Sequence, residues 1–257
     1  MSIYMRQICL VAEHLRPAID TLSGVFGLAP VYVDDAVGKY GLENTLLAVG
    51  TQFLEVVAPT QDGTAAGRYL ARRGGDGGYM VICQAESRTR QDEVRGNAEA
   101  EGVRIATQRD AGSYRMMQLH PGDMGAAFFS VPWVEGDDPA GSWPFAGGTS
   151  WMDKVRADWV TAMTGAELQD DDPDALAARW SAVSGIGIEM RDGVPHIPLL
   201  DATLRFVEAV DGRGAGLGGL DLSVSDRGAV LAAARAHGVP VGDDCVTVCG
   251  TRFYLRD

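Results

Sequence analysis

The feature that most constrains the fold is a unit that occurs four times along the 257-residue chain. In each copy a short apolar run leads into an amphipathic helical pattern, the helix ends at a glycine, and extended segments follow. The opening runs are residues 8–12, 79–83, 159–163 and 220–224, and the glycines are Gly27, Gly102, Gly185 and Gly238. Glycine is favoured after a helix because it adopts the left-handed conformation without a Cβ penalty.

Extended segments complete each copy. Residues 44–49 and 52–58 follow the first helix, and residues 114–120 and 126–131 follow the second. Each copy is therefore predicted to be a β-α-β-β-β module of the α+β class. One such module has an open sheet face and unpaired edges, so two modules are expected to pair. We expect repeated βαβββ modules paired into cupped, barrel-like mixed sheets with the helices outside.

A segment rich in Pro, Gly and Asp separates the first two copies from the last two. It reads WVEGDDPAGSWPFAGGTS and spans residues 133–150, a composition typical of a connection between domains. We predict a first domain at residues 1–134, a linker at 135–150 and a second, more divergent domain at 151–257.

Charge and hydropathy limit the partners. The chain has 22 Lys and Arg against 35 Asp and Glu, a net charge of −13, and no basic run, which argues against nucleic acid or an anionic membrane as a partner. No apolar stretch reaches the roughly 20 residues that span a bilayer, and the N-terminus lacks a signal-peptide pattern. We expect a soluble cytoplasmic protein that binds a small molecule and keeps its cysteines reduced.

The glycines at 214, 216 and 219 match the G-x-G-x-x-G pattern of dinucleotide-binding proteins. In those proteins the glycines follow a strand and open a helix, whereas here they precede the strand at 220–224. We therefore predict no nucleotide cofactor.

Glu55 is the strongest candidate for chemistry. In the run FLEVV it places a carboxylate within an apolar strand, where an unpaired charge costs on the order of several kcal/mol. Strand alternation puts it on the same, inward face as Phe53 and Val57. A solvent-facing or arginine-paired glutamate is the alternative.

His120 lies in LHPGDMG, on the strand face that also carries Met116 and Gln118 if the strand is regular. It is a candidate general base, and the alternative is a structural role in the turn that follows. Met116, Gln118 and Ser130 are assigned to substrate binding. Arg115 faces the other way and is expected to form an exposed ion pair.

Several segments, in order, resemble the vicinal oxygen chelate superfamily, which includes glyoxalase I, bleomycin and fosfomycin resistance proteins, methylmalonyl-CoA epimerase and extradiol dioxygenases. QICLVAEHLRPAIDTLSGVFGLAPV resembles its opening strand and helix, NTLLAVGTQFLEVVAP its paired strands, and LHPGDMGAAFFSVPW the close of its second module. The part from residue 159 to the end looks like a second pair of modules, so the chain resembles the long glyoxalase-like subgroup.

The resemblance implies a cupped sheet that holds one divalent metal ion through the first and last strands of each module. It places Gln7 and Glu55 at these positions in the first module, and Tyr79 and Ser130 in the second. Glutamine and glutamate are credible ligands for Zn, Mn, Fe, Ni or Mg, whereas neutral Tyr and Ser hydroxyls are poor ones. Whether a metal is bound therefore stays open.

The resemblance further implies a lyase or isomerase that polarises a substrate oxygen beside an abstractable proton. Without a metal, Glu55 or His120 is the expected base and Tyr79 the acid, although Tyr79 is equally explained as a wall aromatic with its hydroxyl bonded. A non-catalytic protein that sequesters a small molecule is the alternative, and a ring-cleaving dioxygenase comes third because its iron needs two histidines. Related proteins pair modules across a homodimer, but four modules could also pair within this chain.

Overall fold

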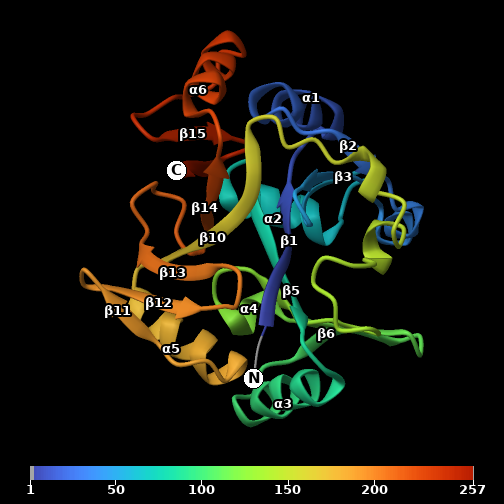
Figure 1. Cartoon of the computed structure of the whole chain (residues 1–257). Coiled ribbons are helices and arrows are strands. Elements are labelled where there is room, and N and C mark those ends of the chain that lie inside the picture. Colours follow the sequence, from blue (N-terminus) through green and yellow to red (C-terminus); the bar gives the residue numbers. More distant parts are fainter. Residues whose placement is uncertain (1–2, 257) are drawn as a thin grey trace. The chain divides into compact units, whose positions relative to one another are not determined.

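The computed structural model describes residues 3–256 of the chain (Figure 1). These residues form 16 strands in a mixed sheet together with helices, which confirms the α+β class. The chain divides into two compact units. The described residues of unit 1 lie within Met1–Gln7, Tyr79–Ser142 and Gly165–Leu217, and those of unit 2 lie within Ile8–Gly78, Trp143–Thr164 and Gly218–Asp257.

Four strands contribute residues to both units, and they are the strands that open the four repeated copies. They are β1 (Ile3–Val11), β5 (Gly77–Ala85), β10 (Val160–Asp170) and β14 (Gly216–Val224). Each strand extends beyond the apolar run that predicts it, because buried polar residues and glycines such as Arg6, Gln169 and Gly216 continue the strand.

Unit 2 holds the other elements of the first and fourth copies. From the first copy come α1 (Leu15–Phe26), β2 (Pro30–Tyr32), β3 (Leu42–Val49) and β4 (Gln52–Pro59), and from the fourth come α6 (Arg227–Ala236), β15 (Cys245–Val248) and β16 (Thr251–Arg256). Strands β2, β3 and β4 are antiparallel neighbours, while β16 is antiparallel to β15 and parallel to β14. Three short 3-10 helices complete the unit at η1 (Asp35–Tyr40), η2 (Pro144–Ala146) and η3 (Met152–Lys154).

Unit 1 holds the other elements of the second and third copies. From the second come α3 (Arg88–Ala100), β6 (Ile105–Asp110), β7 (Tyr114–Leu119), α4 (Pro121–Met124), β8 (Phe128–Ser130) and β9 (Trp133–Val134), and from the third come α5 (Pro173–Ser184), β11 (Glu189–Arg191), β12 (Val194–Pro198) and β13 (Thr203–Glu208). In both copies the last strands run parallel to the opening strand, β8 and β9 beside β5 and β13 beside β10. The first and third copies have the predicted β-α-β-β-β order, the second adds α4 and a fourth strand after its first helix, and the fourth has only β15 and β16 after α6 among the described residues. In unit 1 the strands β11 and β6 each pair with one strand only, as do β2 and β15 in unit 2.

The ends of the helices follow the signals in the sequence. Gly27, Gly102, Gly185 and Gly238 all have a φ near +68°, within the left-handed region. At the other ends, the side chains of Ser87, Asp172 and Asp226 accept hydrogen bonds from the backbone N–H groups of the first helical turn. These contacts satisfy backbone groups that a helix end leaves unpaired.

Helices α2 and α4 and the three 3-10 helices were not predicted. Helix α2 (Ala65–Arg73) in unit 2 begins after Thr64, whose hydroxyl accepts a hydrogen bond from the N–H of Gly67 at 2.9 Å, and ends at Gly74 in the left-handed conformation. Thr64 and Gly74 are both recognisable cap residues. Both residues lie outside the repeated unit, so the repeat pattern does not predict the helix between them.

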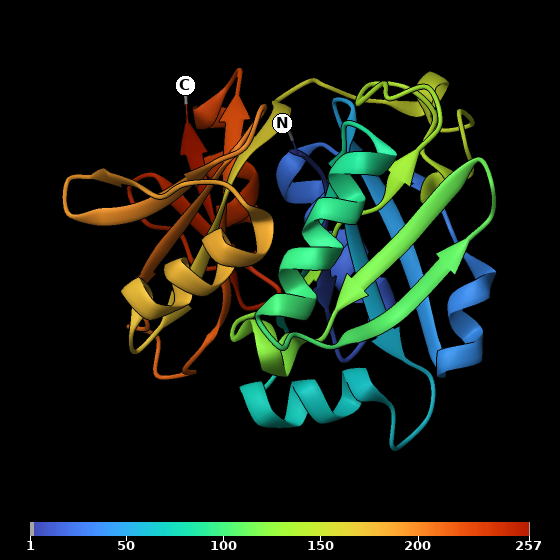
Figure 2. The same cartoon turned by 90° about the horizontal axis from the view of Figure 1, so that it is seen from below.

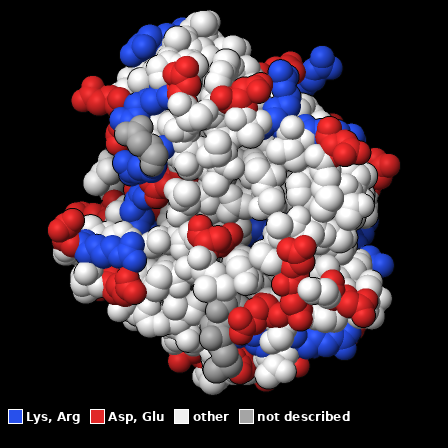
Figure 3. All heavy atoms as spheres, viewed as in Figure 1, with Lys and Arg blue, Asp and Glu red and all other residues white. Residues whose placement is uncertain are grey.

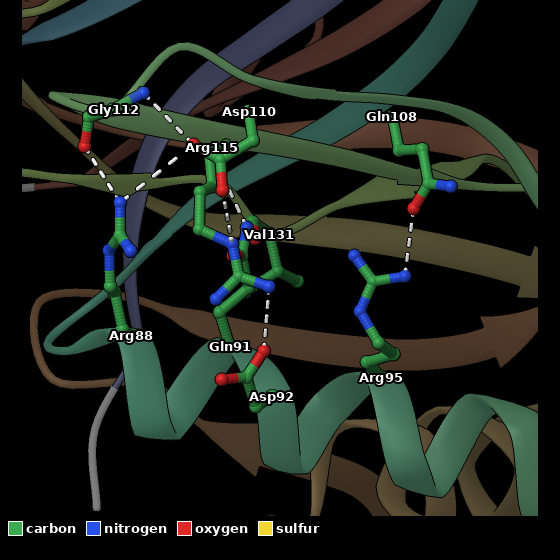
Figure 4. Close-up of polar contacts among 9 residues, drawn as sticks. All are labelled: Arg88, Gln91, Asp92, Arg95, Gln108, Asp110, Gly112, Arg115 and Val131. Atoms are coloured by element: carbon green, nitrogen blue, oxygen red, sulfur yellow. Dashed lines mark hydrogen bonds and ion pairs between the residues drawn. The ribbon is translucent and has the colours of Figure 1, made fainter.

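In unit 1, α3 packs on the second copy's strands. Figure 2 shows this helix lying along β6 and β7. The fully buried Gln91 amide donates to the backbone carbonyls of Arg115 and Val131, at 3.1 and 2.8 Å (Figure 4). Nearby, the Arg95 guanidinium donates to Gln108 at 2.8 Å at the surface of the same helix.

Helix α3 also joins the second copy to the third through α5. The Arg90 side chain is buried, donates to the carbonyl oxygen of Ser184 at the C-terminal end of α5, and pairs with Glu93 at 3.1 Å. The Asn97 amide donates to the Val183 carbonyl at 3.3 Å. A cationic donor at a helix C-terminus satisfies carbonyls that have no partner within the helix. This contact therefore ties α3 to α5.

We predict that Arg90→Met destabilises the protein by about 2 kcal/mol, because the α5 carbonyl loses a charged donor and stays buried. The matched control is Arg95→Met on the same helix, whose surface hydrogen bond contributes within about 0.5 kcal/mol. Urea denaturation followed by circular dichroism measures both. Equal losses in the two variants would show that Arg90 does not hold α5.

In unit 2, the first and fourth copies pack through aromatic and backbone contacts. The rings of Phe26 in α1 and Phe253 in β16 lie 4.7 Å apart. In the same unit, the buried Gln52 side chain accepts from the N–H of Met163 at 2.7 Å and donates to the Met163 carbonyl at 2.9 Å. Gln52 thereby binds a β10 residue as a neighbouring strand would.

The turn between β3 and β4 is the tightest backbone approach in unit 2. Val49 pairs with Gln52, so Gly50 and Thr51 form a two-residue turn. Gly50 has φ +59°, and a Cβ added there would lie 2.4 Å from the backbone carbonyl oxygen of Thr161. Only glycine fits both the left-handed conformation and this contact.

Gly50→Ala is expected to cost at least about 2 kcal/mol of stability, because the side chain meets both backbone strain and a backbone atom. Gly63→Ala is the control, since Gly63 has φ +74° but nothing within 4 Å of the added Cβ. It should cost about 1 kcal/mol, the strain alone. Chemical denaturation of the two variants measures the difference, and the contact would be unimportant if they were equally stable.

The charges on the surface are largely interspersed. On the face drawn in Figure 3, acidic and basic side chains lie among uncharged ones. Elsewhere in the contacts of the described residues, exposed ion pairs include Arg16 with Asp20 at 3.3 Å and Arg191 with Glu189 at 2.7 Å. Such pairs each contribute little to stability. Among residues 3–256, every helix is too short or too polar to cross a membrane.

Candidate functional site

Glu55 lies in β4 of unit 2, and its side chain is buried with 8% of the residue exposed. Phe53 and Val57, the neighbours expected on its face, are buried as well. The register of the hairpin pairs Glu55 with Leu46 and Val57 with Asn44, so Asn44 shares the face of Glu55 one pair away. The Glu55 carboxylate is therefore buried, as an inward orientation requires.

An amide and a protonated thiol lie beside the Glu55 carboxylate within unit 2. The Asn44 side-chain amide donates to Glu55 Oε1 at 2.6 Å. The buried Cys9 thiol in β1 donates to the Leu10 carbonyl at 3.4 Å. Burial, and then the charge of Glu55, raise the pKa of Cys9 well above its ordinary value, so the thiol keeps its proton.

The residues assigned to substrate binding lie together in unit 1. Gln118 in β7 pairs with Ser130 in β8, so both are on one face, and Met116 shares that face by alternation. The Gln118 amide contacts the Met80 sulfur at 3.8 Å, and Met80 pairs with Phe128. The register thus adds Met80 and Phe128 to the expected set, which pattern alone could not do because it does not align β5 with β8.

Three of the predicted residues in unit 1 are buried. Ser130 is 1% exposed, and its hydroxyl donates to the Met117 carbonyl at 3.1 Å. Tyr79 is 4% exposed and packs edge-on against the Phe128 ring at 5.1 Å. Gln7, in the unit 1 part of β1, is also buried. Their roles as ligand, acid or substrate contact stay predictions.

His120 occupies a turn between β7 and β8. Its ring nitrogen Nδ1 accepts from the N–H of Gly122 at 3.1 Å, where it caps the short helix α4, and Arg104 Nη2 lies 3.3 Å from the same nitrogen. A neutral imidazole has one acceptor nitrogen, which is the atom a general base needs. The structural role for His120 is therefore realised, and its acceptor is already used.

Arg104 and Asp123 hold this turn together. Arg104 Nε and Nη2 donate to the two oxygens of the Asp123 carboxylate at 2.7 and 2.8 Å, and its backbone N–H donates at 3.0 Å. These bonds hold the pKa of Asp123 well below its ordinary value of 3.8. The ionised form of Asp123 thus favours the folded state.

The stability that Asp123 contributes is present above its ordinary pKa of 3.8 and declines as the pH falls below it. We therefore expect Asp123→Asn to lower the melting temperature at pH 7, and the difference from wild type to shrink towards pH 2. Asp20→Asn, which removes an exposed ion pair in α1, serves as the control and should change little. A difference that stays constant across pH would contradict the assignment.

Arg115 forms the ion pairs expected from its outward position. Its guanidinium lies 2.7 Å from Asp92 in α3 and 3.7 Å from Asp110 in β6 (Figure 4). The hydrogen bond from Arg115 lowers the pKa of Asp92, so this pair stabilises the contact between helix and hairpin. Arg115 is thus accounted for by structure rather than by substrate.

The side chains that usually bind divalent metals are not clustered in the described part of the chain. Across residues 3–256, no group of three or more His, Cys, Asp or Glu side chains could hold a metal ion. A metal ion needs several lone pairs that converge on one point, so the metal that the resemblance implies stays a prediction.

Asn44 and Cys9 were missed as partners of Glu55. A signal for Asn44 existed: a two-residue turn at Gly50 and Thr51 sets the hairpin register, and that register places Asn44 on the face of Glu55. For Cys9 the sequence offers none, because β1 and β4 are joined through a helix and two strands.

Comparison with known proteins gives two results. A family model described as a glyoxalase-like domain matches residues 8–184. The structure is similar to a hypothetical protein from Staphylococcus aureus, with 11% identity, 100% of this chain and 99% of the other covered, and a TM-score of 0.65. It is also similar to a mutant 4-hydroxymandelate synthase from Streptomyces coelicolor, with 15% identity, 93% and 76% covered, and a TM-score of 0.65.

At these identities the two solved structures are evidence for the fold alone. Among curated proteins, none shows significant sequence similarity to this chain.

Proposed function

The chain belongs to the family of glyoxalase-like domains, within the vicinal oxygen chelate superfamily, and from that premise we propose that it is a small-molecule lyase or isomerase with Glu55 as its base. The reaction begins when Glu55 takes a proton from a carbon beside a substrate carbonyl. The electron pair of the broken C–H bond moves into the carbonyl group and leaves an enolate oxygen. When the deprotonated carbon carries a hydroxyl group, that hydroxyl proton moves to the enolate oxygen and the abstracted proton returns to the former carbonyl carbon, which completes an isomerisation. Loss of a leaving group from the carbon next to the deprotonated one completes an elimination.

The observation that carries this proposal is the buried Glu55 carboxylate with neutral donors. Asn44 donates to it at 2.6 Å, and the Cys9 thiol keeps its proton. Hydrogen bonds to a carboxylate favour its ionised form, which is the form a base needs at neutral pH. A buried charge without a task is costly, so a buried carboxylate in an apolar strand favours a functional role.

Glu55 is preferred to His120 as the base because the His120 acceptor nitrogen already binds the Gly122 N–H. The role expected of Tyr79, an acid that donates its hydroxyl proton to a developing oxygen charge, stays a prediction from the sequence. No step is assigned to a metal ion, because among residues 3–256 no group of three or more His, Cys, Asp or Glu side chains could hold one.

A second function, sequestration of a small molecule without turnover, is favoured by a different observation. Met80, Met116, Gln118 and Phe128 lie on one face of unit 1 and are all partly exposed. Thioether and aromatic groups adapt to apolar or aromatic ligands, and the Gln118 amide adds one polar contact. This face has the composition of a binding surface for a neutral, apolar compound.

The test is proton exchange in deuterated water. A panel of α-hydroxy ketones, hemithioacetals and thioesters with an acidic C–H is incubated with the protein, and deuterium incorporation is followed by mass spectrometry. Wild type should exchange at least one compound, and Glu55→Gln should slow exchange by about 100-fold or more. Glu43→Gln is the control, because Glu43 is exposed on the neighbouring strand β3.

Each result separates the two functions. Exchange that is unchanged in Glu55→Gln contradicts the role of Glu55, and binding of a compound without exchange or turnover supports sequestration. Metal content is measured in the same samples by mass spectrometry, and we expect no stoichiometric divalent metal that depends on Glu55. Stoichiometric metal in wild type that disappears in Glu55→Gln would instead support Glu55 as a metal ligand.

A further inference from the structure

Strand β11 of unit 1 has an open edge. It forms a hairpin with β12 (Figure 1), and among the described residues it pairs with that strand alone. All three of its residues are exposed, and Met190 at its centre is 60% exposed. The unpaired backbone groups of an edge strand can pair with a strand of another chain, so proteins usually protect such edges.

The other three strands that pair on one side only are protected. Residues 240–242 bond to the backbone of β15 and so cover its edge. Strand β2 begins with Pro30, and the carbonyl of Val31 accepts a hydrogen bond from Lys154 at 3.0 Å. Strand β6 has a shift in register between Ile105 and Thr107. Covering segments, prolines and bulges all hinder pairing at an edge, and among the described residues β11 has none of them.

The hairpin determines which backbone groups of β11 point outward. Asp192 and Gly193 form a two-residue turn, with φ values of +51° and +80°. In such a hairpin the pair next to the turn, here Arg191 and Val194, exchanges both of its backbone hydrogen bonds, and the following pair exchanges none. The N–H and C=O groups of Met190 therefore point away from β12, towards the open edge.

The charges of β11 are complementary to those of a second, antiparallel β11. A two-fold axis at Met190 places the two Met190 residues opposite each other, and their outward N–H and C=O groups can form two hydrogen bonds. The same axis places Glu189 of each copy opposite Arg191 of the other, at positions where facing side chains lie closest. Parallel pairing in register would instead place like charges opposite each other.

We propose that β11 is a dimerisation edge, at which two copies of this chain pair antiparallel about a two-fold axis at Met190. The occupant is a second copy because the sequence Glu-Met-Arg is complementary to itself in this register. Three residues from each copy make a small contact, so the dimer is weak and forms only at high concentration. Glu55 lies in unit 2, so the dimer and the proposed reaction are tested separately.

The first test is sedimentation velocity at protein concentrations from about 1 μM to about 1 mM, which covers weak association. Wild type should shift from monomer to dimer. Glu189→Arg and Arg191→Glu each place like charges opposite each other twice, so each should weaken the dimer by about tenfold or more. The double variant, Glu189→Arg with Arg191→Glu, restores opposite charges and should dimerise as wild type does.

Net charge alone predicts a different result. Glu189→Arg changes the net charge from −13 to −13 + 2 = −11, and Arg191→Glu changes it to −13 − 2 = −15. Repulsion between whole molecules would therefore make the first variant dimerise more and the second less. The matched control is Asp20→Arg, which makes the same charge change at an exposed ion pair of α1 and should leave the dimer intact.

The second test is oxidative cross-linking. Opposite residues at a hydrogen-bonded position have Cα atoms about 5.5 Å apart, which a disulfide can span. Met190→Cys should therefore form a covalent dimer under mild oxidation. Val210→Cys, at a residue that is 80% exposed outside β11, should not do so beyond the level of wild type, in which Cys245 and Cys249 are partly exposed.

Circular dichroism confirms that each variant is folded. Wild type that stays monomeric up to about 1 mM, with no cross-link in Met190→Cys, would overturn the proposal. A dimer that both single charge reversals leave unchanged would place the interface elsewhere. A dimer that the double variant does not restore would rule out the antiparallel register at Met190.

Discussion

The two-residue turn at Gly50 and Thr51 is the constraint on which the candidate base depends. A turn of this length sets which residues of β3 and β4 lie opposite one another, and a shift by one residue would move every side chain to the other face. Asn44 would then no longer share a face with Glu55. The backbone carbonyl oxygen of Thr161 leaves no room for a side chain at Gly50. Glycine therefore permits this turn, the turn sets the register of the two strands, and the register places Asn44 on the face of Glu55.

A second constraint acts on whole copies rather than on single strands. A β-α-β-β-β module cannot bury its open sheet face alone, and each unit joins elements of two copies, the second and third in unit 1 and the first and fourth in unit 2. In unit 1, the buried Arg90 of the second copy binds the end of the third copy's helix, and in unit 2 Phe26 of the first copy packs on Phe253 of the fourth. The domain boundaries proposed at residues 134 and 151 remain a prediction beside this division.

The candidate chemistry depends on the surroundings of one buried charge, the Glu55 carboxylate. Glu55 is removed from water, which disfavours its ionised form, and it receives hydrogen bonds from neutral donors, which favour that form. The bond from the uncharged Asn44 amide favours the ionised carboxylate, which is the form that the proposed proton transfer requires.

The sequence by itself determined the four copies, their helix ends and the inward position of Glu55. All of these depend on residues that are close together in the chain. Apolar residues repeat about every 3.6 residues in a helix and every two residues in a strand, and glycine adopts a positive φ after a helix. Arg115 as an ion-paired residue also followed from alternation alone. The hairpin register, and with it Asn44, was within reach of the same reasoning because the turn has two residues.

Only the tertiary structure decided which copies join, which nitrogen of His120 is occupied, and which strands bring Met80 and Phe128 beside Gln118. These contacts link residues on strands or helices whose alignment no local pattern specifies. They depend on side-chain packing between distant segments, and many pairings of the same modules satisfy the same periodicity. The fold could therefore be predicted from the sequence, but the hydrogen-bond partners of its polar side chains could not.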